Sequence, residues 1–201
     1  MPGHPGALER FRREAKVMAK LKHDGIVKVD DFGETDGRYW LRMELVEGDS
    51  LQGYADSRGG KIPQDELLEL LKQVVSGLDY AHKRTDMQGE PLGIIHRDVS
   101  PSNTLVSYGG EIKIADFGIA KARISGYNTK DGVLKGKFEY MSPEQASGLN
   151  IGPRADVFST GIILHEMLTG RRLFKTDSDI KTLEKIKAVD IQPPSALNPA
   201  I

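Results

Sequence analysis

Polar residues that can orient a hydroxyl group or bind a metal ion lie close together in the middle of the sequence. Residues 96–98 read His-Arg-Asp, Asn103 follows Asp98, and residues 116–118 read Asp-Phe-Gly. The carboxylate of Asp98 is ionised at neutral pH, so it can orient a hydroxyl group and accept its proton. Asn103 and Asp116 carry the oxygen atoms that Mg²⁺ prefers. These residue types suit phosphoryl transfer, which needs an oriented nucleophile and metal ions that neutralise the phosphates.

Two further motifs follow in the same order along the chain. Residues 142–144 read Ser-Pro-Glu, and Asp156 precedes Gly161 within one apolar stretch. Each motif alone is weak, because an isolated Asp-Phe-Gly is more often a turn and an isolated histidine more often packs in a core. The ordered set is specific, and on it the sequence resembles the eukaryotic-like Ser/Thr protein kinases of bacteria, from about Leu8 to Pro194. The resemblance implies an α+β, protein-kinase-like fold, mostly the helical C-lobe with a remnant N-lobe.

The resemblance also implies a role for each motif residue. Asp98 would be the catalytic base, and Asn103 and Asp116 would hold Mg²⁺. Arg97 would pair with a phosphate group that orders a neighbouring loop, because a guanidinium binds phosphate through two hydrogen bonds. The candidate phosphorylation sites in that loop are Ser125, Tyr127 and Thr129.

A hydrophobic spine through the core is a second implication of the resemblance. His96 and Phe117 would belong to this spine, with Met18 and Val29 above them. Asp156 would anchor it from below.

The nucleotide site implied by the resemblance lies at the second predicted strand. Met43 would be the gatekeeper, and the backbone of Glu44 and Val46 would bind adenine, since free N–H and C=O groups are expected at a strand edge. Leu105 would form the floor of the adenine pocket. Glu14 would be the helix glutamate that pairs with a lysine in the family. Without the later motifs, the same stretch reads equally well as an ordinary edge strand.

Ser100 and Lys137 depart from the family pattern in a reciprocal way. Most Ser/Thr kinases carry a lysine two residues after the catalytic aspartate and a threonine where Lys137 stands. We therefore expect Lys137 to supply the ammonium group near Asp98, with the hydroxyl coming from Ser100; the alternative is that Lys137 is a solvated loop residue. On the first interpretation, Lys137→Ala reduces turnover at least tenfold, or about 1.4 kcal/mol of transition-state stabilisation. Ser100 also differs from the loops of tyrosine kinases, which favours a Ser/Thr acceptor.

Both ends of the sequence lack features of the family. Residues 1–13 contain no lysine and no Gly-rich phosphate loop. In the family, the arginine that pairs with the glutamate at position 144 comes from a later helix, which would lie beyond Ile201. The resemblance therefore implies a kinase domain truncated at both ends. Two alternatives stay open at this point: a non-catalytic kinase-like scaffold that binds a partner, and a fragment completed in trans.

Hydrophobic periodicity predicts the elements that would position these residues. A helix is expected over 5–22 and strands over 26–32 and 39–46, with a turn at 33–37 between them. A short helix capped by Asp49 or Ser50 should follow, then a long helix over 63–83. The predicted division is a partial N-lobe over residues 1–46 and a C-lobe over 47–201.

The predicted C-lobe alternates short strands with strong helices. Strands are expected at 94–95, 104–106 and 112–115. A helix is expected over 154–169, with Gly170 as its C-cap. Another helix should begin near Asp177 or Ser178 and end at the proline pair 193–194.

Composition excludes several classes of protein. The 201 residues carry 28 Lys+Arg against 29 Asp+Glu, so no basic field favours nucleic acid. No cysteine is present, which excludes disulfide scaffolds and is compatible with a reducing cytoplasm, the expected compartment. No apolar run approaches the length of a membrane span. The expected partners are ATP and a protein substrate with Ser/Thr hydroxyls, and an exposed hairpin edge suggests self-association.

Overall fold

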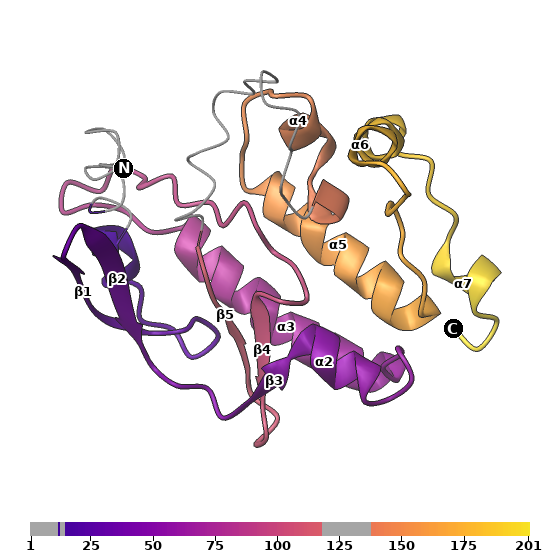
Figure 1. Cartoon of the computed structure of the whole chain (residues 1–201), viewed down its shortest axis with the longest axis horizontal. Helices are drawn as coiled ribbons and strands as arrows, with labels where there is room; N and C mark the ends of the chain where they lie inside the picture. The colour runs from indigo at the N-terminus through magenta and orange to yellow at the C-terminus, as the bar shows by residue number, and fades with distance from the viewer. Residues whose placement is uncertain (1–11, 13–14, 118–137) are drawn as a thin grey trace.

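Two small β-sheets and a set of helices make up the described part of the chain, residues 12, 15–117 and 138–201 of a computed structural model (Figure 1). Strands β1 (Val29–Thr35) and β2 (Arg38–Met43) form an antiparallel hairpin. Strands β3 (Gly48–Ser50), β4 (Thr104–Ser107) and β5 (Ile112–Ile114) form a second antiparallel sheet in that order. The α+β class predicted from the sequence is confirmed.

The hairpin is tighter than the sequence predicts. Asp36 and Gly37 both adopt positive φ angles, 51° and 73°, which suits a two-residue turn between twisted strands. Gly33, expected in the turn, instead lies in β1 opposite Trp40. A side chain at Gly33 would collide with the indole ring, so the glycine allows the indole to lie across the strand. Ile26, expected to begin the first strand, forms an isolated bridge with Ile114.

Two helices frame the start of the helical body. Helix α2 (Leu51–Asp56) begins at Ser50, whose hydroxyl accepts a hydrogen bond from the Gly53 amide at 3.1 Å, as one of the two predicted caps. Helix α3 (Gln64–His82) matches the predicted long helix within one residue at each end. Its buried face packs against β5 and α5, and it consists of Leu67, Leu70, Leu71, Val74, Gly77, Leu78 and Ala81.

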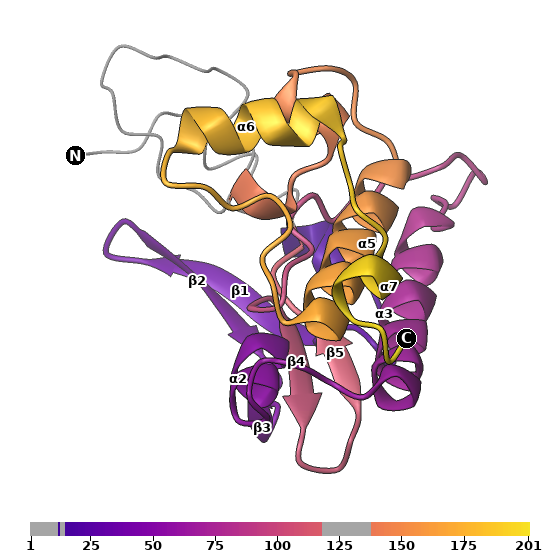
Figure 2. The same ribbon diagram turned by 90° about the vertical axis from the view of Figure 1, so that its right-hand side faces the viewer.

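Helix α5 (Arg154–Thr169) lies beside α3 in both views (Figures 1 and 2). Its bounds agree with the prediction, and Gly170 ends it at φ 69°, a left-handed conformation that glycine adopts without strain. Most of its side chains are buried, polar ones included, so α5 is a central helix. The 3₁₀ turn η3 (Phe138–Tyr140) and the short helix α4 (Pro143–Ala146) pack against it.

The last two helices lie beyond α5. Helix α6 (Asp179–Ala188) crosses over α4 and η3, as Figure 2 shows, and α7 (Pro194–Leu197) packs against α5. The prediction that the proline pair ends the third helix is wrong. Val189 ends α6 in a left-handed conformation, and Pro194 begins α7, because proline fits the first helical position.

Two other expectations from the sequence fare differently. Residues 15–18 are helical, within the predicted helix over 5–22, but most of that helix lies outside the described residues. Residues 94–95 form no strand; they have no regular secondary structure and lead into the His-Arg-Asp segment. In the described part of the chain, no helix has the length and apolar character needed to cross a bilayer.

Candidate active site

Asp156, in the first turn of α5, holds the backbone of the His-Arg-Asp segment. Its buried carboxylate accepts hydrogen bonds from the amides of His96 and Arg97, both at 2.8 Å. His82 Nε2, at the end of α3, lies 2.7 Å from the same carboxylate. Arg97 has a φ of 67°, an unfavourable conformation for a residue with a side chain. The two hydrogen bonds that the backbone amides donate to Asp156 offset that strain and fix the loop.

His96 links this loop to the Asp-Phe-Gly segment. Its Nε2 donates to the carbonyl of Ala115 at 2.9 Å, and its Nδ1 accepts from the amide of Asp98 at 3.2 Å. Because a carbonyl can only accept and a backbone amide can only donate, Nε2 carries the proton and Nδ1 does not, so the imidazole is neutral. Burial lowers the pKa of His96 and outweighs the opposing effect of Asp156, which agrees with this state. The ring also packs on Phe117, with centroids 4.5 Å apart.

Asn103 joins the two halves of the predicted metal site. Its side-chain NH₂ group donates to the backbone carbonyl of Asp98 at 3.0 Å. The backbone carbonyl of Asn103 accepts a hydrogen bond from the backbone amide of Ala115 at 2.8 Å. Asp116, next to Ala115, is exposed and left-handed, with φ 60°. Because the side-chain nitrogen Nδ2 of Asn103 is hydrogen-bonded, the side-chain oxygen Oδ1 is the group left to bind a cation. This donor set fits Mg²⁺, which needs few protein ligands because it keeps waters and binds phosphate oxygens.

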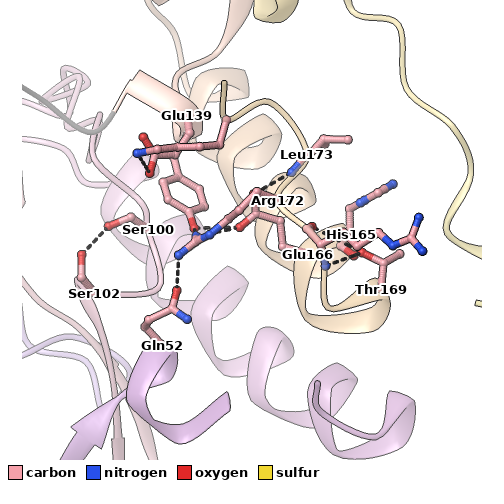
Figure 3. A network of polar contacts seen from close by, with 12 residues as sticks. Gln52, Ser100, Ser102, Glu139, His165, Glu166, Thr169, Arg172 and Leu173 are labelled. Atoms are coloured by element: carbon pink, nitrogen blue, oxygen red, sulfur yellow. Dashed lines mark hydrogen bonds and ion pairs between the residues drawn. The ribbon is translucent and has the colours of Figure 1, made fainter. Parts of the chain in front are cut away.

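Ser100 lies fully buried at the base of the loop (Figure 3). Its hydroxyl is 3.1 Å from that of Ser102, and its carbonyl accepts from the hydroxyl of Thr104 at 3.0 Å. The Ser100 hydroxyl, which was predicted to act beside Asp98, therefore lies within hydrogen-bond distance of Ser102 in the same loop. Lys137, the other half of the predicted swap, lies outside the described residues, as do Glu14 and the three candidate phosphorylation sites.

The predicted adenine edge follows β2, but one expectation about it is wrong. The amide of Glu44 is engaged, since it donates to the carbonyl of Lys28 at 3.0 Å. Within the described residues, no hydrogen bond involves the carbonyl of Glu44 or the backbone of Val46. Met43 ends β2 partly exposed, and Leu105 lies half-buried in β4. The edge therefore offers the Glu44 carbonyl and both backbone groups of Val46.

Gln145 is a site residue that the sequence analysis missed. Its side-chain amide donates to the carbonyl of Arg97 at 2.9 Å, so α4 holds the same residue whose amide is bonded to Asp156. The same side chain accepts from the amide of Ser142 at 2.9 Å and completes a capping box. The signal was present in the sequence, because Ser-x-x-Gln at 142–145 is the pattern of a capping box.

A polar network connects α5 with the turn next to the site (Figure 3). The buried Glu166 accepts hydrogen bonds from the hydroxyl of Tyr140 at 2.7 Å and from the amide of Leu173 at 2.9 Å. Arg172 pairs with Glu166 at 3.0 Å, donates to Tyr140, and reaches Gln52 of α2 at 2.8 Å. Burial, together with Glu166, raises the pKa of Tyr140 well above its usual range. The network fixes η3 against α5 and α2.

The remaining predicted anchors are distributed as follows. Met18, Val29 and Phe117 are buried in one hydrophobic cluster, in keeping with the predicted spine. The side chain of Glu144 has no hydrogen bond or ion pair among the residues that the structure describes.

Comparison with known proteins identifies the family. The family model described as "Protein kinase domain" matches residues 4–198. The chain belongs to the protein kinase domain family. It is 39% identical, over 99% of its length, to the tyrosine-protein kinase MasK of Myxococcus xanthus. It is 38% identical, over 96% of its length, to the serine/threonine-protein kinase PrkC of Bacillus subtilis.

Solved structures agree with the family assignment. The kinase domain of PknI from Mycobacterium tuberculosis matches with a TM-score of 0.71 and 28% identity, covering 98% of this chain and 66% of that one. The kinase-like fold predicted from the sequence is thereby confirmed. The chain spans 31% of MasK, 28% of PrkC and 45% of the serine/threonine-protein kinase PknL of Mycobacterium tuberculosis.

Proposed function

We propose that this chain is the catalytic domain of a protein kinase that transfers the γ-phosphoryl group of ATP to Ser or Thr hydroxyls of a protein. The observation that carries the proposal is the hydrogen-bonded frame around Asp98, Asn103 and Asp116. Asp156 of α5 and Gln145 of α4 hold the backbone just before Asp98, and His96 links this loop to Ala115, the residue before Asp116. A site prepared in this way suits a reaction that depends on positioning and electrostatics.

Each residue of the chain has one task in the proposed reaction. Asp98 orients the hydroxyl of the protein substrate and accepts its proton. Asn103 and Asp116 would hold Mg²⁺ through an amide and a carboxylate oxygen. When bound, Mg²⁺–ATP supplies the phosphoryl group and the charge neutralisation. The Glu44 carbonyl and the Val46 backbone would bind adenine, with Leu105 beneath the ring.

The remaining assignments complete the proposal. Lys137 would supply positive charge beside Asp98, and Arg97 would pair with a phosphorylated loop residue. Glu14 would take the place of the helix glutamate. Residues 1–46 would act as the N-lobe and 47–201 as the C-lobe.

The cytoplasm is the proposed compartment, since ATP is available there and the chain has no cysteine to oxidise. Self-association would use the hairpin, where Tyr39 and Trp40 are exposed, together with the exposed Leu45 just after β2.

A second candidate function is a non-catalytic scaffold or a half-enzyme completed in trans. The observation that favours it is Ser100, which stands where most Ser/Thr kinases carry a lysine, two residues after the catalytic aspartate. The metal-binding pair Asn103 and Asp116 favours catalysis instead, because a scaffold has no chemical need for it.

Phosphotransfer distinguishes the two candidates. The chain is incubated with Mg²⁺ and γ-labelled ATP, with casein as acceptor, and the labelled amino acids are identified after hydrolysis. We expect phosphoserine and phosphothreonine, and a loss of at least 100-fold in Asp98→Asn, since a general base contributes about 10²–10⁴-fold. The matched control is Asp79→Asn, an aspartate in an exposed ion pair on α3, which should retain full activity.

Three outcomes would change the assignment. Label found only on tyrosine would move the acceptor class toward that named for MasK. Equal transfer by Asp98→Asn would remove Asp98 from its role. No transfer by a folded wild-type chain would favour the scaffold or the half-enzyme.

A further inference from the structure

An ion pair between Lys113 and both carboxylate oxygens of Glu44 joins strand β5, which precedes Asp116, to the segment that follows β2. Nζ of Lys113, in the middle of β5, lies 2.9 Å from each carboxylate oxygen of Glu44. Only 18% of the Lys113 side chain and 29% of the Glu44 side chain are exposed, against 69% and 70% for the surface pair of Lys72 and Glu69. Solvent therefore screens the Lys113–Glu44 pair less than an ordinary surface ion pair.

Glu44 is also fixed from its other side. One carboxylate oxygen accepts the amide of Lys28 at 2.8 Å, and the amide of Glu44 donates to the carbonyl of Lys28 at 3.0 Å. The preceding residue, Val27, is itself bonded to β5, since its amide donates to the carbonyl of Ile114 at 2.9 Å. Burial raises the pKa of Glu44, but the hydrogen bonds from Lys113 and Lys28 outweigh it, so the net pKa lies below the usual value. The carboxylate is thus charged at neutral pH.

The position of the pair relates it to the proposed nucleotide site. Lys113 lies three residues before Asp116 on one continuous segment, and it faces Leu105 across the β4–β5 register. Glu44 follows Met43 and carries one of the carbonyls proposed to bind adenine. The ion pair therefore connects the adenine end of the site to its metal end. A ligand that contacts both ends can bind well only if the separation between them is fixed.

We propose that Lys113 is a positioning residue for the nucleotide: its ion pair with Glu44 fixes the adenine-binding backbone at 44–46 relative to Asp116. The inference rests on the proposed function, because it names a residue that prepares the same site. Lys113 acts through Glu44. Its effect falls on Mg²⁺–ATP, which spans both ends, and spares adenosine, which contacts the adenine end alone.

The experiment compares the two ligands on the full chain. Lys113→Met keeps an unbranched side chain but removes the charge. We expect the Kd for Mg²⁺–ATP to rise at least fivefold by calorimetry, while the Kd for adenosine changes less than twofold. Lys113→Arg, which keeps the positive charge beside Glu44, should hold the Kd for Mg²⁺–ATP within twofold of wild type. Lys72→Met, on the exposed face of α3, is the matched control and should bind both ligands as wild type does.

Other outcomes separate this inference from the proposed function. An unchanged Kd for Mg²⁺–ATP in Lys113→Met would overturn the inference and leave the proposed function standing. Equal weakening of both ligands would also overturn it, since the pair would then only support the local packing. A folded wild-type chain that binds neither ligand would overturn the proposed nucleotide site, and the positioning role with it. Amide exchange at residues 44–47 should be faster in Lys113→Met than in wild type, and unchanged exchange would also overturn the inference.

Discussion

At the scale of single residues, Asp156 holds the backbone next to Asp98 in place. One buried carboxylate accepts two backbone amides of the catalytic loop and lies within hydrogen-bond distance of His82. Charge-assisted hydrogen bonds of this kind are stronger than neutral ones. Asp156 therefore stabilises the left-handed conformation of Arg97 and, next to it, the position of Asp98.

Removing this carboxylate should destabilise the whole chain. Asp156→Ala leaves the buried amide of His96 and the partly buried amide of Arg97 without their acceptor, and an unsatisfied buried group costs about 1–3 kcal/mol. We expect the free energy of unfolding to fall by about 3 kcal/mol in urea titrations. Asp79→Ala, which removes an exposed carboxylate on α3, should change it by less than about 0.5 kcal/mol. A loss below about 1 kcal/mol for Asp156→Ala would show that the loop does not depend on this anchor.

The buried imidazole of His96 predicts a pH dependence of stability. Burial lowers the pKa of His96 in the folded chain below its usual value of 6.5, so below that pH the unfolded chain binds more protons. The contribution of this group to stability is therefore full at neutral pH and is lost as the pH falls below about 6.5, by at most about 1.4 kcal/mol per pH unit.

Urea titrations between pH 7.5 and 5 measure this effect. The free energy of unfolding should decline less steeply in His96→Gln than in wild type, because the other histidines contribute equally to both. Parallel curves for the two proteins would contradict the neutral, buried state of His96.

The residues with a fixed spacing could be predicted from the sequence, and those defined by three-dimensional contacts could not. Asp98, Asn103 and Asp116 follow from the order of motifs, because their chemistry demands those residue types. The engaged amide of Glu44 could not be foreseen, since its acceptor on Lys28 depends on how the hairpin folds. The same holds for Lys113, whose role arises from a partner 69 residues away.

At the scale of elements, β3 is held by an unusually close approach to β4. A Cβ added at Gly48 would lie inside contact distance of the carbonyl of Val106 and 2.7 Å from Cα of Ser107. Both neighbours are backbone atoms, so neither can move aside cheaply. Only glycine allows β3 to pair at this point, directly after the segment proposed to bind adenine.

Two glycine substitutions should therefore have opposite effects. Gly48→Ala should lower the free energy of unfolding by about 1–3 kcal/mol, as overpacking does. Gly161→Ala, in the exposed middle of α5 with open space around it, should raise it by about 0.5–1 kcal/mol, because alanine favours the helix. Thermal and urea unfolding of both variants measure this. An unaffected Gly48→Ala would show that β3 can separate from β4 at little cost.

Helices whose start and end depend on residues within the helix could be predicted from the sequence more closely than strands, whose bounds depend on distant partners. Helix α3 carries an apolar face after Pro63, and α5 is a long, mostly apolar segment that ends at Gly170, so their bounds agreed closely with the prediction. The strands are three to seven residues long, and pairing with distant segments decides where they begin and end. The stretch 94–95 looks like a strand by composition, but it has no strand beside it in the described structure.

At the scale of the whole molecule, the candidate site exists only in the complete arrangement of elements. The anchor Asp156 lies 60 residues after His96, and Lys113 lies 69 residues after Glu44. The hairpin of β1 and β2, the β3–β4–β5 sheet and the helical body each supply one part of the site (Figure 1). A ligand that binds across these parts must stabilise the folded chain as a whole.

The most direct test of the account is a thermal-shift titration of the full chain with ATP, with and without Mg²⁺. Binding to the folded state alone adds about 2.7 kcal/mol at 100 times the Kd, so Tm should rise by roughly 5–10 °C. Asp116→Ala should abolish the Mg²⁺-dependent part of this rise. Asp36→Ala is the matched control, an exposed aspartate in the same left-handed conformation, and should retain it. A cooperative transition that ATP does not shift, or an equal shift in Asp116→Ala, would contradict the account.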